Sequence, residues 1–247
     1  MCSGEGFHMD SSLCTTIDIE SGLVRRVLLN GRTMPAPRSH FIMVALSSEC
    51  TLIMFGKLAD DTLCNDGFLI THDSLDCRAA VFTGEVPSPR EGAAACMLGE
   101  STLFLWGGFG EDGFLADGYI LDVDTLHWTA VSLSPFLPEG KQPQPRFLHS
   151  AICVPSGEVL IFGGMNNAGA LRENLMFSRM SETEDRSVWE VRSLGSLPGP
   201  QPAPRFGHSM ANIHPNVAVL WGGHSSSPDQ GFLMDGFILD MVRWEWQ

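Results

Sequence analysis

The chain has 247 residues, a hydrophobic content of 44% and a formal net charge of −14 at pH 7. A chain of this length can bury a large core. Its 15 Lys and Arg residues form no basic run, which argues against a nucleic-acid backbone or an anionic membrane surface as partner.

The N-terminus aligns without gaps with a segment further along the chain, and residues 13–30 correspond to the end of a repeat unit. An offset of 104 places Gly4 on Gly108, Asp18 on Asp122 and Val24 on Trp128. We therefore expect Thr15–Val27 to form the last two strands of a repeat unit whose first two strands are missing.

Residues 31–83 form the first full unit and depart most from the others. The unit begins at Pro37-Arg38, and its apolar runs are interrupted by Gly56-Lys57, which we align with a glycine pair in later units. Cys77 stands where the later units have Trp.

Three further units, residues 84–133, 134–194 and 195–247, repeat one pattern. Each has Pro-Arg, an apolar run, Gly-Gly, a second apolar run and Trp. In residues 84–133 the pattern is formed by Arg90, Thr102–Trp106, Gly107-Gly108, Tyr119–Asp122 and Trp128. In residues 134–194 it is formed by Arg146, Val159–Phe162, Gly163-Gly164 and Trp189. In residues 195–247 it is formed by Arg205, Val217–Trp221, Gly222-Gly223, Phe237–Asp240 and Trp246.

The four arginines recur at intervals of 52, 56 and 59 residues. A period of about 50 residues with several short apolar runs is typical of a propeller blade. Such a sheet cannot bury both of its faces alone, so the sheets must pack radially against one another. We expect the tryptophans to pack between blades and the glycines to occupy turns or close approaches.

The pattern Pro-Arg-x-x-His, Gly-Gly and a distal Trp resembles the kelch repeat. Phe147-Leu148-His149-Ser150 and Phe206-Gly207-His208-Ser209 carry the resemblance most clearly. It covers residues 13–247 and implies an all-β, kelch-type β-propeller of the galactose oxidase/kelch-like class. We expect a single domain with about four full blades plus a partial N-terminal blade over residues 13–30.

A closed propeller of this kind usually completes one blade with strands from both ends of the chain. Here both ends supply a third strand, so they do not complete a blade cleanly. We therefore expect the chain to be part of a larger chain or complex, although a compact closure of five blades stays open.

The loops indicate where a partner would bind. If strands a to d run outward from the axis, the b–c loops and the d–a connections share one face, and loops on a rigid scaffold commonly carry binding. The candidate binding residues on this face are Phe109, Glu111, Asp112, Phe114, Asn166, Asn167, Arg172, His224, Asp229 and Phe232. Phe114 and Phe232, at equivalent positions, could instead fold back onto the next blade.

Arg90, Arg146 and Arg205 allow two interpretations. A residue that recurs in every unit usually serves the unit, through scaffold hydrogen bonds or ion pairs. The alternative is a ring of arginines near the axis that binds an acidic peptide.

The sequence offers little support for catalysis, and we predict no catalytic, cofactor-binding or metal residue. Gly108–Gly113 matches Gly-x-Gly-x-x-Gly, but the following segment is a predicted strand, whereas pyrophosphate binding needs a helix N-terminus. Metal-ligand spacing is absent, and the single tyrosine, Tyr119, argues against a copper-radical oxidase.

The seven cysteines show no disulfide-framework spacing, and the N-terminus lacks the features of a signal peptide. We therefore expect a reduced protein of the cytoplasm or nucleus. The resemblance favours a protein–protein interaction scaffold or adaptor that binds a peptide or loop of another protein. The alternatives are an enzyme with an axial pocket, such as a sugar isomerase or lyase, and a truncated structural segment.

Overall fold

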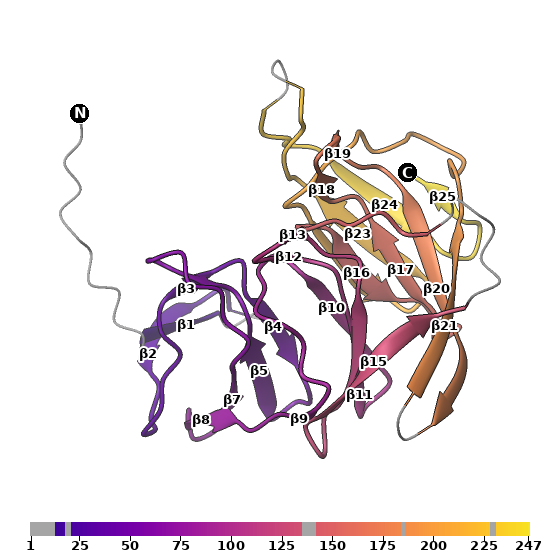
Figure 1. Ribbon diagram of the computed structural model, residues 1–247. Helices are drawn as coiled ribbons and strands as arrows, with labels where there is room; N and C mark the ends of the chain where they lie inside the picture. The colour runs from indigo at the N-terminus through magenta and orange to yellow at the C-terminus, as the bar shows by residue number, and fades with distance from the viewer. Residues whose placement is uncertain (1–12, 18–20, 135–141, 184–185, 228–230) are drawn as a thin grey trace.

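The computed structural model describes residues 13–17, 21–134, 142–183, 186–227 and 231–247 (Figure 1). Regular structure in these residues consists of β-strands, most of which form four-stranded antiparallel sheets that follow one another in chain order. The second and third of these are joined at one edge into a nine-stranded sheet that includes one short strand, and the other short strands form two-stranded sheets. The prediction of an all-β, propeller-type fold is confirmed. The division of the chain into blades at the expected boundaries remains a prediction.

We call the four sheets units 1 to 4, and each contains strands a to d in sequence order. Their bounds are β4 (Ile42–Ala45), β5 (Cys50–Met54), β7 (Gly67–Thr71) and β8 (Cys77–Ala80) in unit 1; β10 (Ala94–Leu98), β11 (Thr102–Trp106), β14 (Gly118–Asp122) and β15 (His127–Leu133) in unit 2; β16 (Ser150–Cys153), β17 (Val159–Phe162), β20 (Asn174–Thr183) and β21 (Arg186–Ser193) in unit 3; and β22 (Ser209–His214), β23 (Val217–Trp221), β24 (Gly236–Asp240) and β25 (Glu245–Trp246) in unit 4.

Shorter strands lie between and before these sheets. They are β1 (Leu13–Ile17), β2 (Val24–Leu28), β3 (Arg38–Ser39), β6 (Lys57–Leu58), β9 (Thr83–Gly84), β12 (Phe109–Gly110), β13 (Gly113–Phe114), β18 (Met165–Asn166) and β19 (Gly169–Ala170). The inner strands β4, β10, β16 and β22 lie next to one another in that order. At the outer edge, β15 pairs in parallel with β21, which joins units 2 and 3.

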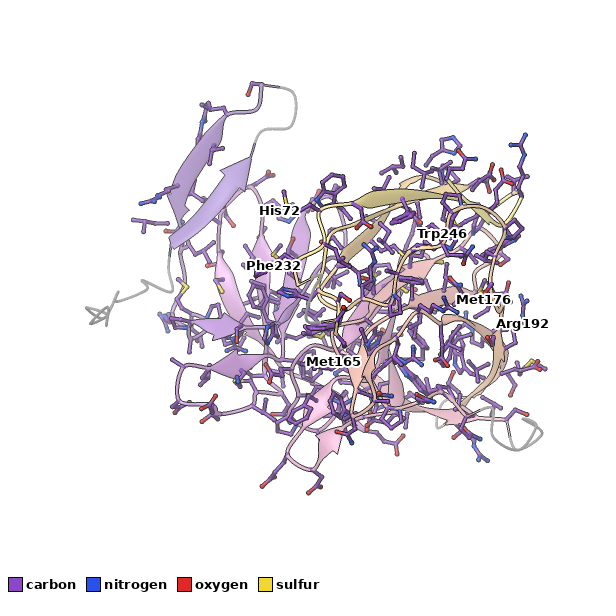
Figure 2. All side chains as sticks on the ribbon, turned by 90° about the horizontal axis from the view of Figure 1, so that it is seen from above. His72, Met165, Met176, Arg192, Phe232 and Trp246 are labelled. Atoms are coloured by element: carbon purple, nitrogen blue, oxygen red, sulfur yellow. The ribbon has the colours of Figure 1, made fainter. Side chains whose placement is uncertain are left out.

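Units 2 and 3 bury side chains on both faces of the sheet, because residues that alternate along a strand point to opposite sides. In unit 2, Leu103 and Leu105 pack toward unit 1, whereas Phe104 and Trp106 pack toward unit 3. The expected tryptophans lie between sheets: the ring centroid of Trp189 is 5.1 Å from that of Phe104, and that of Trp246 is 5.5 Å from that of Phe162. Figure 2 labels Met176 and Trp246 at the interface between units 3 and 4.

Glycine pairs connect neighbouring units through the backbone. The amide of Gly164 donates to the carbonyl of Arg205 in the next unit at 2.9 Å, and Gly108 makes the same bond to Arg146 at 2.8 Å. Gly163 has a φ of +66°, and a Cβ atom there would lie 2.6 Å from the Arg205 carbonyl oxygen. The pair therefore needs glycine for its backbone angle and for the close approach.

The prediction that Gly56-Lys57 replaces the glycine pair in unit 1 is wrong by one residue, because Phe55 and Gly56 occupy the two positions. Gly56 takes the second position of the pair, because its amide donates to the Arg90 carbonyl at 2.9 Å as Gly108 does to Arg146. Phe55, rather than a glycine, takes the first position with a φ of +61°. Lys57 is instead the first residue of the loop.

Three of the repeated arginines, Arg90, Arg146 and Arg205, are fully buried, and their guanidinium groups are bound inside their own units. Arg90 Nη1 donates to the Gly107 carbonyl at 3.1 Å, and the guanidinium forms two bonds to Asp117 at 2.7 and 2.8 Å. The amide of Arg90 donates to the Cys64 carbonyl of the preceding unit at 3.2 Å. The side chain thus serves one unit while its peptide bond is held by another.

The N-terminal strands expected within Thr15–Val27 are present as β1 and β2. Their register pairs Ile17 with Val24, which matches the pairing of Leu121 with Trp128 in unit 2. Asn30 bridges to Asp76 of unit 1 in parallel. The interpretation of residues 13–30 as part of a blade stays a prediction.

Two repeat histidines, His149 and His208, are buried beneath the loop face. Burial, together with the nearby charge of Arg205, lowers the pKa of His208 to about 4. Burial and Arg146 lower the pKa of His149 in the same way. Both rings are therefore neutral at physiological pH.

We expect Gly163→Val to reduce the free energy of unfolding by about 3–5 kcal/mol, because the side chain meets the Arg205 backbone and adds backbone strain. Gly157→Val is the matched control, since Gly157 has a φ of +82° but open space around its Cβ position. It should cost only the strain, about 1–2 kcal/mol. Urea unfolding measures both free energies. An equal loss of stability in the two variants would contradict the close approach of Gly163 to the Arg205 carbonyl.

Arg90→Met should reduce the free energy of unfolding by roughly 3 kcal/mol, because Asp117 and the Gly107 carbonyl lose their buried partner. Arg243→Met is the control: it removes the exposed pair of Arg243 with Glu245 at 3.5 Å and should change stability by less than about 1 kcal/mol. Chemical denaturation of both variants measures the difference. A loss at Arg90 no larger than that at Arg243 would refute the scaffold role.

The buried histidines should make the fold sensitive to acid. His208 is neutral in the folded state down to about pH 4, whereas an unfolded histidine binds its proton near pH 6.5. The unfolded state therefore gains protons first, and stability falls as pH drops from about 6.5 to about 4, by on the order of 3 kcal/mol for this group. Replacing the histidine, as in His208→Gln, should flatten this part of the pH–stability curve. The exposed His214→Gln should leave it unchanged, and identical curves for both variants would disprove the assignment.

Candidate binding face

The b–c loop of unit 2 folds into a small hairpin on the predicted face. Phe109 of β12 pairs with Phe114 of β13, and their ring centroids lie 5.2 Å apart. Both rings also contact Phe147 of unit 3, at 5.8 and 5.4 Å. Glu111 and Asp112 form the exposed turn of this hairpin. The aromatic contacts therefore hold two carboxylates out toward solvent.

A cavity of about 610 Å³ lies on one side of the hairpin, between the loops of units 1 and 2. Its apolar lining includes Leu63, Phe109 and Leu115, and its carboxylates come from Asp61, Glu91, Glu111 and Asp112. The one cation among the lining residues is Lys57. A cavity that combines apolar walls with several carboxylates suits a side chain with an apolar stem and a cationic end.

The charges of this cavity are partly paired. Lys57 Nζ lies 3.0 Å from Asp61 and 3.7 Å from Glu91, and the hydrogen bond with Asp61 together with the charge of Glu91 raises the pKa of Lys57. The buried Glu91 also lies 2.6 Å from His40 Nδ1. Glu111 and Asp112 are the exposed carboxylates at the rim, toward which an approaching cation would be drawn.

A second cavity, of about 500 Å³, lies on the other side of the hairpin, toward unit 3. Phe109 and Asp112 line this cavity as well as the first one. Asn166 and Asn167 contribute from the β18–β19 hairpin, where Asn166 Nδ2 donates to Gln144 Oε1 at 2.9 Å and its Oδ1 accepts from the Ala168 amide at 2.9 Å. Six of the predicted residues thus meet around one hairpin.

The other predicted residues lie apart from these two cavities. Arg172 is exposed on the loop after β19 and lines neither cavity. His224 lies between Phe206, at a centroid distance of 5.3 Å, and the exposed Phe232, at 4.3 Å. Phe114 does contact the next unit, whereas Phe232 packs on its own unit. Asp229 lies outside the described residues.

Arg90, Arg146 and Arg205 do not belong to this surface. Each guanidinium is buried and bound to an acid of its own unit, Asp117, Glu173 or Asp235, at 2.7, 2.5 and 2.7 Å respectively. We therefore assign the three arginines to the scaffold and leave them out of the proposed binding set, because a guanidinium with no exposed surface cannot bind a peptide.

The neighbouring axial cavity, of about 490 Å³, is lined by His40, His149, His208 and His224 among others. Neither an arginine nor a carboxylate is among its lining residues. The ring nitrogens of His208 are shielded from solvent. The lining of this cavity therefore lacks the arginine and carboxylate groups that we would expect beside the histidines in the active site of a sugar isomerase or lyase.

Sequence reasoning missed two groups of residues. Lys57, Asp61 and Leu63 line the first cavity, but none of them is among the binding residues that the sequence predicts. The acids that bind the arginines were also missed, although an acid precedes strand c in every unit. These acids are Asp66, Asp117, Glu173 and Asp235.

The described residues contain no group of three or more His, Cys, Asp or Glu side chains that could hold a metal ion. Within the same part of the chain, no helix is long and apolar enough to cross a membrane.

Comparison with known proteins gives the family. The family model of the KLHDC2/KLHL20/DRC7 Kelch-repeats domain matches residues 4–140 and 40–247. Adagio-like protein 3 of Oryza sativa subsp. japonica is 28% identical over 200 residues, which cover 77% of this chain and 30% of that protein. An F-box/kelch-repeat protein of Arabidopsis thaliana is 31% identical over 159 residues, 63% of this chain and 31% of that protein.

The flagellar outer-arm dynein alpha chain of Chlamydomonas reinhardtii is 28% identical over 227 residues, which cover 86% of this chain and 5% of that protein. The chain spans about a third of the length of the Adagio relatives it matches. Because the family model covers nearly the whole chain and the structure has the matching repeated sheets, the chain belongs to the KLHDC2/KLHL20/DRC7 family of kelch-repeat domains.

Proposed function

We propose that this kelch-repeat domain is an interaction adaptor that binds an extended segment of another protein on its b–c/d–a loop face. The observation that carries the proposal is the β12–β13 hairpin, which is flanked by two cavities and contributes Phe109 and Asp112 to both. An extended chain laid across the hairpin could place one side chain in each cavity. Aromatic anchors beside pockets are typical of protein interfaces.

The chemistry of the cavities supports a partner segment with a basic side chain. Four carboxylates and one lysine line the first cavity, and the whole chain carries a net charge of −14. The name of the F-box/kelch-repeat relative joins kelch repeats to an F-box, which supports an adaptor role. We further propose a cytoplasmic or nuclear location, within a larger chain or complex, without nucleic-acid or membrane partners.

A random peptide library selected on residues 1–247 would test the proposal. We expect enrichment of peptides with Lys or Arg. The charge-neutral variant Glu111→Gln/Asp112→Asn should bind a selected peptide at least about tenfold more weakly, because the exposed rim carboxylates are lost. Fluorescence anisotropy measures the affinities.

The matched control is Glu100→Gln/Asp124→Asn, which removes the same charge from the turns at the opposite end of the strands in unit 2. It should bind as the natural chain does. Equal weakening by both double variants would show that only net charge matters. Loss of binding in neither variant would place the binding surface elsewhere.

A further inference from the structure

One face of unit 4 is exposed although the same face of every preceding unit is covered. Trp221 ends strand b and pairs with Gly236, as Trp106 pairs with Gly118. Trp221 is 60% exposed, whereas Trp106 and its other counterparts Met54 and Phe162 are at most 1% exposed. The difference lies in what covers the position rather than in the residue, because Trp occupies both.

Two further positions of this face behave in the same way. Ile238 in strand c is 42% exposed, although its counterparts Leu69, Ile120 and Met176 are buried. Ile213, eight residues after Arg205, is 64% exposed, although Leu98 and Val154 at the same distance from their arginines are buried. Strands a, b and c of unit 4 therefore all present bare apolar side chains.

The covered faces show what kind of element fits here. Trp106 and Phe104 pack against Phe177 and Trp189 of unit 3, at centroid distances of 4.6 and 5.1 Å. Val159 and Ile161, from strand b of unit 3, belong to the same cluster. The covering element is thus another sheet whose strand b presents alternate aliphatic residues.

The complementary half of such an interface is also exposed, at the N-terminal side. Val24 of β2 has the register of Trp128 and is 59% exposed, whereas Trp128, Trp189 and Trp246 are buried. Among the described residues, β1 pairs only with β2, so its other edge lacks a strand. From above, the β1–β2 hairpin and the yellow C-terminal sheet lie at the two ends of the series of sheets (Figure 2).

Unit 1 shows which strands are lacking. On its side toward β2, the outer residues Ile70 and Cys77 are buried in one cluster with Leu29. Met43 on the inner strand β4 is 67% exposed, whereas Ala95, Ala151 and Met210 at the same position pack against the preceding unit. On this face of unit 1, the segment after β2 therefore covers the outer strands, whereas the inner strand is exposed.

We propose that the face formed by Ile213, Trp221 and Ile238 binds an apolar β-hairpin of this repeat type, supplied by a partner polypeptide. The hairpin adds the two inner strands beside β1. Alternate side chains of its second strand face Trp221 and Ile238, and the residues between them face Met43. Strand addition at the free edge of β1 provides the backbone bonds, and the bare apolar side chains provide the burial.

This inference does not depend on the loop face, because the hairpin contacts the sheet faces rather than the β12–β13 loop. The probe is a peptide of residues 145–164, the inner strands of unit 3, with Cys153 replaced by Ser. It contains no Trp, so tryptophan fluorescence reports the protein alone. The matched control peptide carries Val159→Asp and Ile161→Asp on the side that would face Trp221.

Acrylamide quenching and thermal unfolding of the 247-residue chain provide the measurements. We expect the first peptide to protect Trp221, so that the part of the tryptophan fluorescence that acrylamide quenches readily is lost. It should also raise the melting temperature of the protein by about 5 °C or more. The control peptide should do neither. Ile238→Asp should remove both effects, whereas Val242→Asp, an exposed change in the turn before β25, should preserve them.

Three outcomes would overturn the proposal. One is unchanged quenching at saturating peptide with a monomeric protein. Another is a dimer in light scattering that Ile238→Asp dissociates, since a second copy would then cover the face.

The third outcome comes from a fusion protein, which is used if the free peptide aggregates. Residues 145–164 are then fused before Met1, and the fusion should melt at a higher temperature than its Val159→Asp/Ile161→Asp version. Equal melting temperatures of these fusions would also refute the hairpin.

Discussion

The rest of the structure depends on the interactions of the buried arginine that opens each of units 2 to 4. Its guanidinium closes the unit by binding the carbonyl at the glycine pair and the acid before strand c. Its own peptide group accepts from, and donates to, the loop of the preceding unit. A buried charge is costly unless it is paired and hydrogen-bonded, so the loop, the strand and the neighbouring unit must adopt one arrangement together.

This constraint also positions the candidate binding face. The b–c loops start at the glycine pairs, whose positions are fixed by the arginines of the following units. Each loop therefore starts from a rigid point, and the hairpin of β12 and β13 can hold Glu111 and Asp112 between two cavities. The buried charges are thus paired within the scaffold, and the exposed carboxylates of Glu111 and Asp112 lie on the proposed binding face.

The alternating pattern of the strands explains both the cohesion of the fold and its open side. Every sheet has two apolar faces, so its burial depends on neighbours on both sides. Units 2 and 3 have such neighbours, and the aromatic residues that their sheets direct toward a neighbour, such as Phe104, Trp106 and Phe162, are buried. Unit 4 has a neighbour on one side, and Trp221 is exposed for that reason alone.

The sequence by itself determined the fold, because the arginine, glycine pair, strand and tryptophan recur at intervals of 52 to 59 residues, which is typical of propeller blades. It also placed Phe109, Asp112 and Asn166 on one face, since loops of equivalent position emerge at the same end of the strands. Only the tertiary structure showed that Lys57 meets Glu91 and that Arg90 meets Asp117, because these pairs join residues that the sequence separates. Burial was decided in the same way: Trp106 and Trp221 share one local pattern, and the presence or absence of a neighbouring sheet makes one a core residue and the other a surface residue.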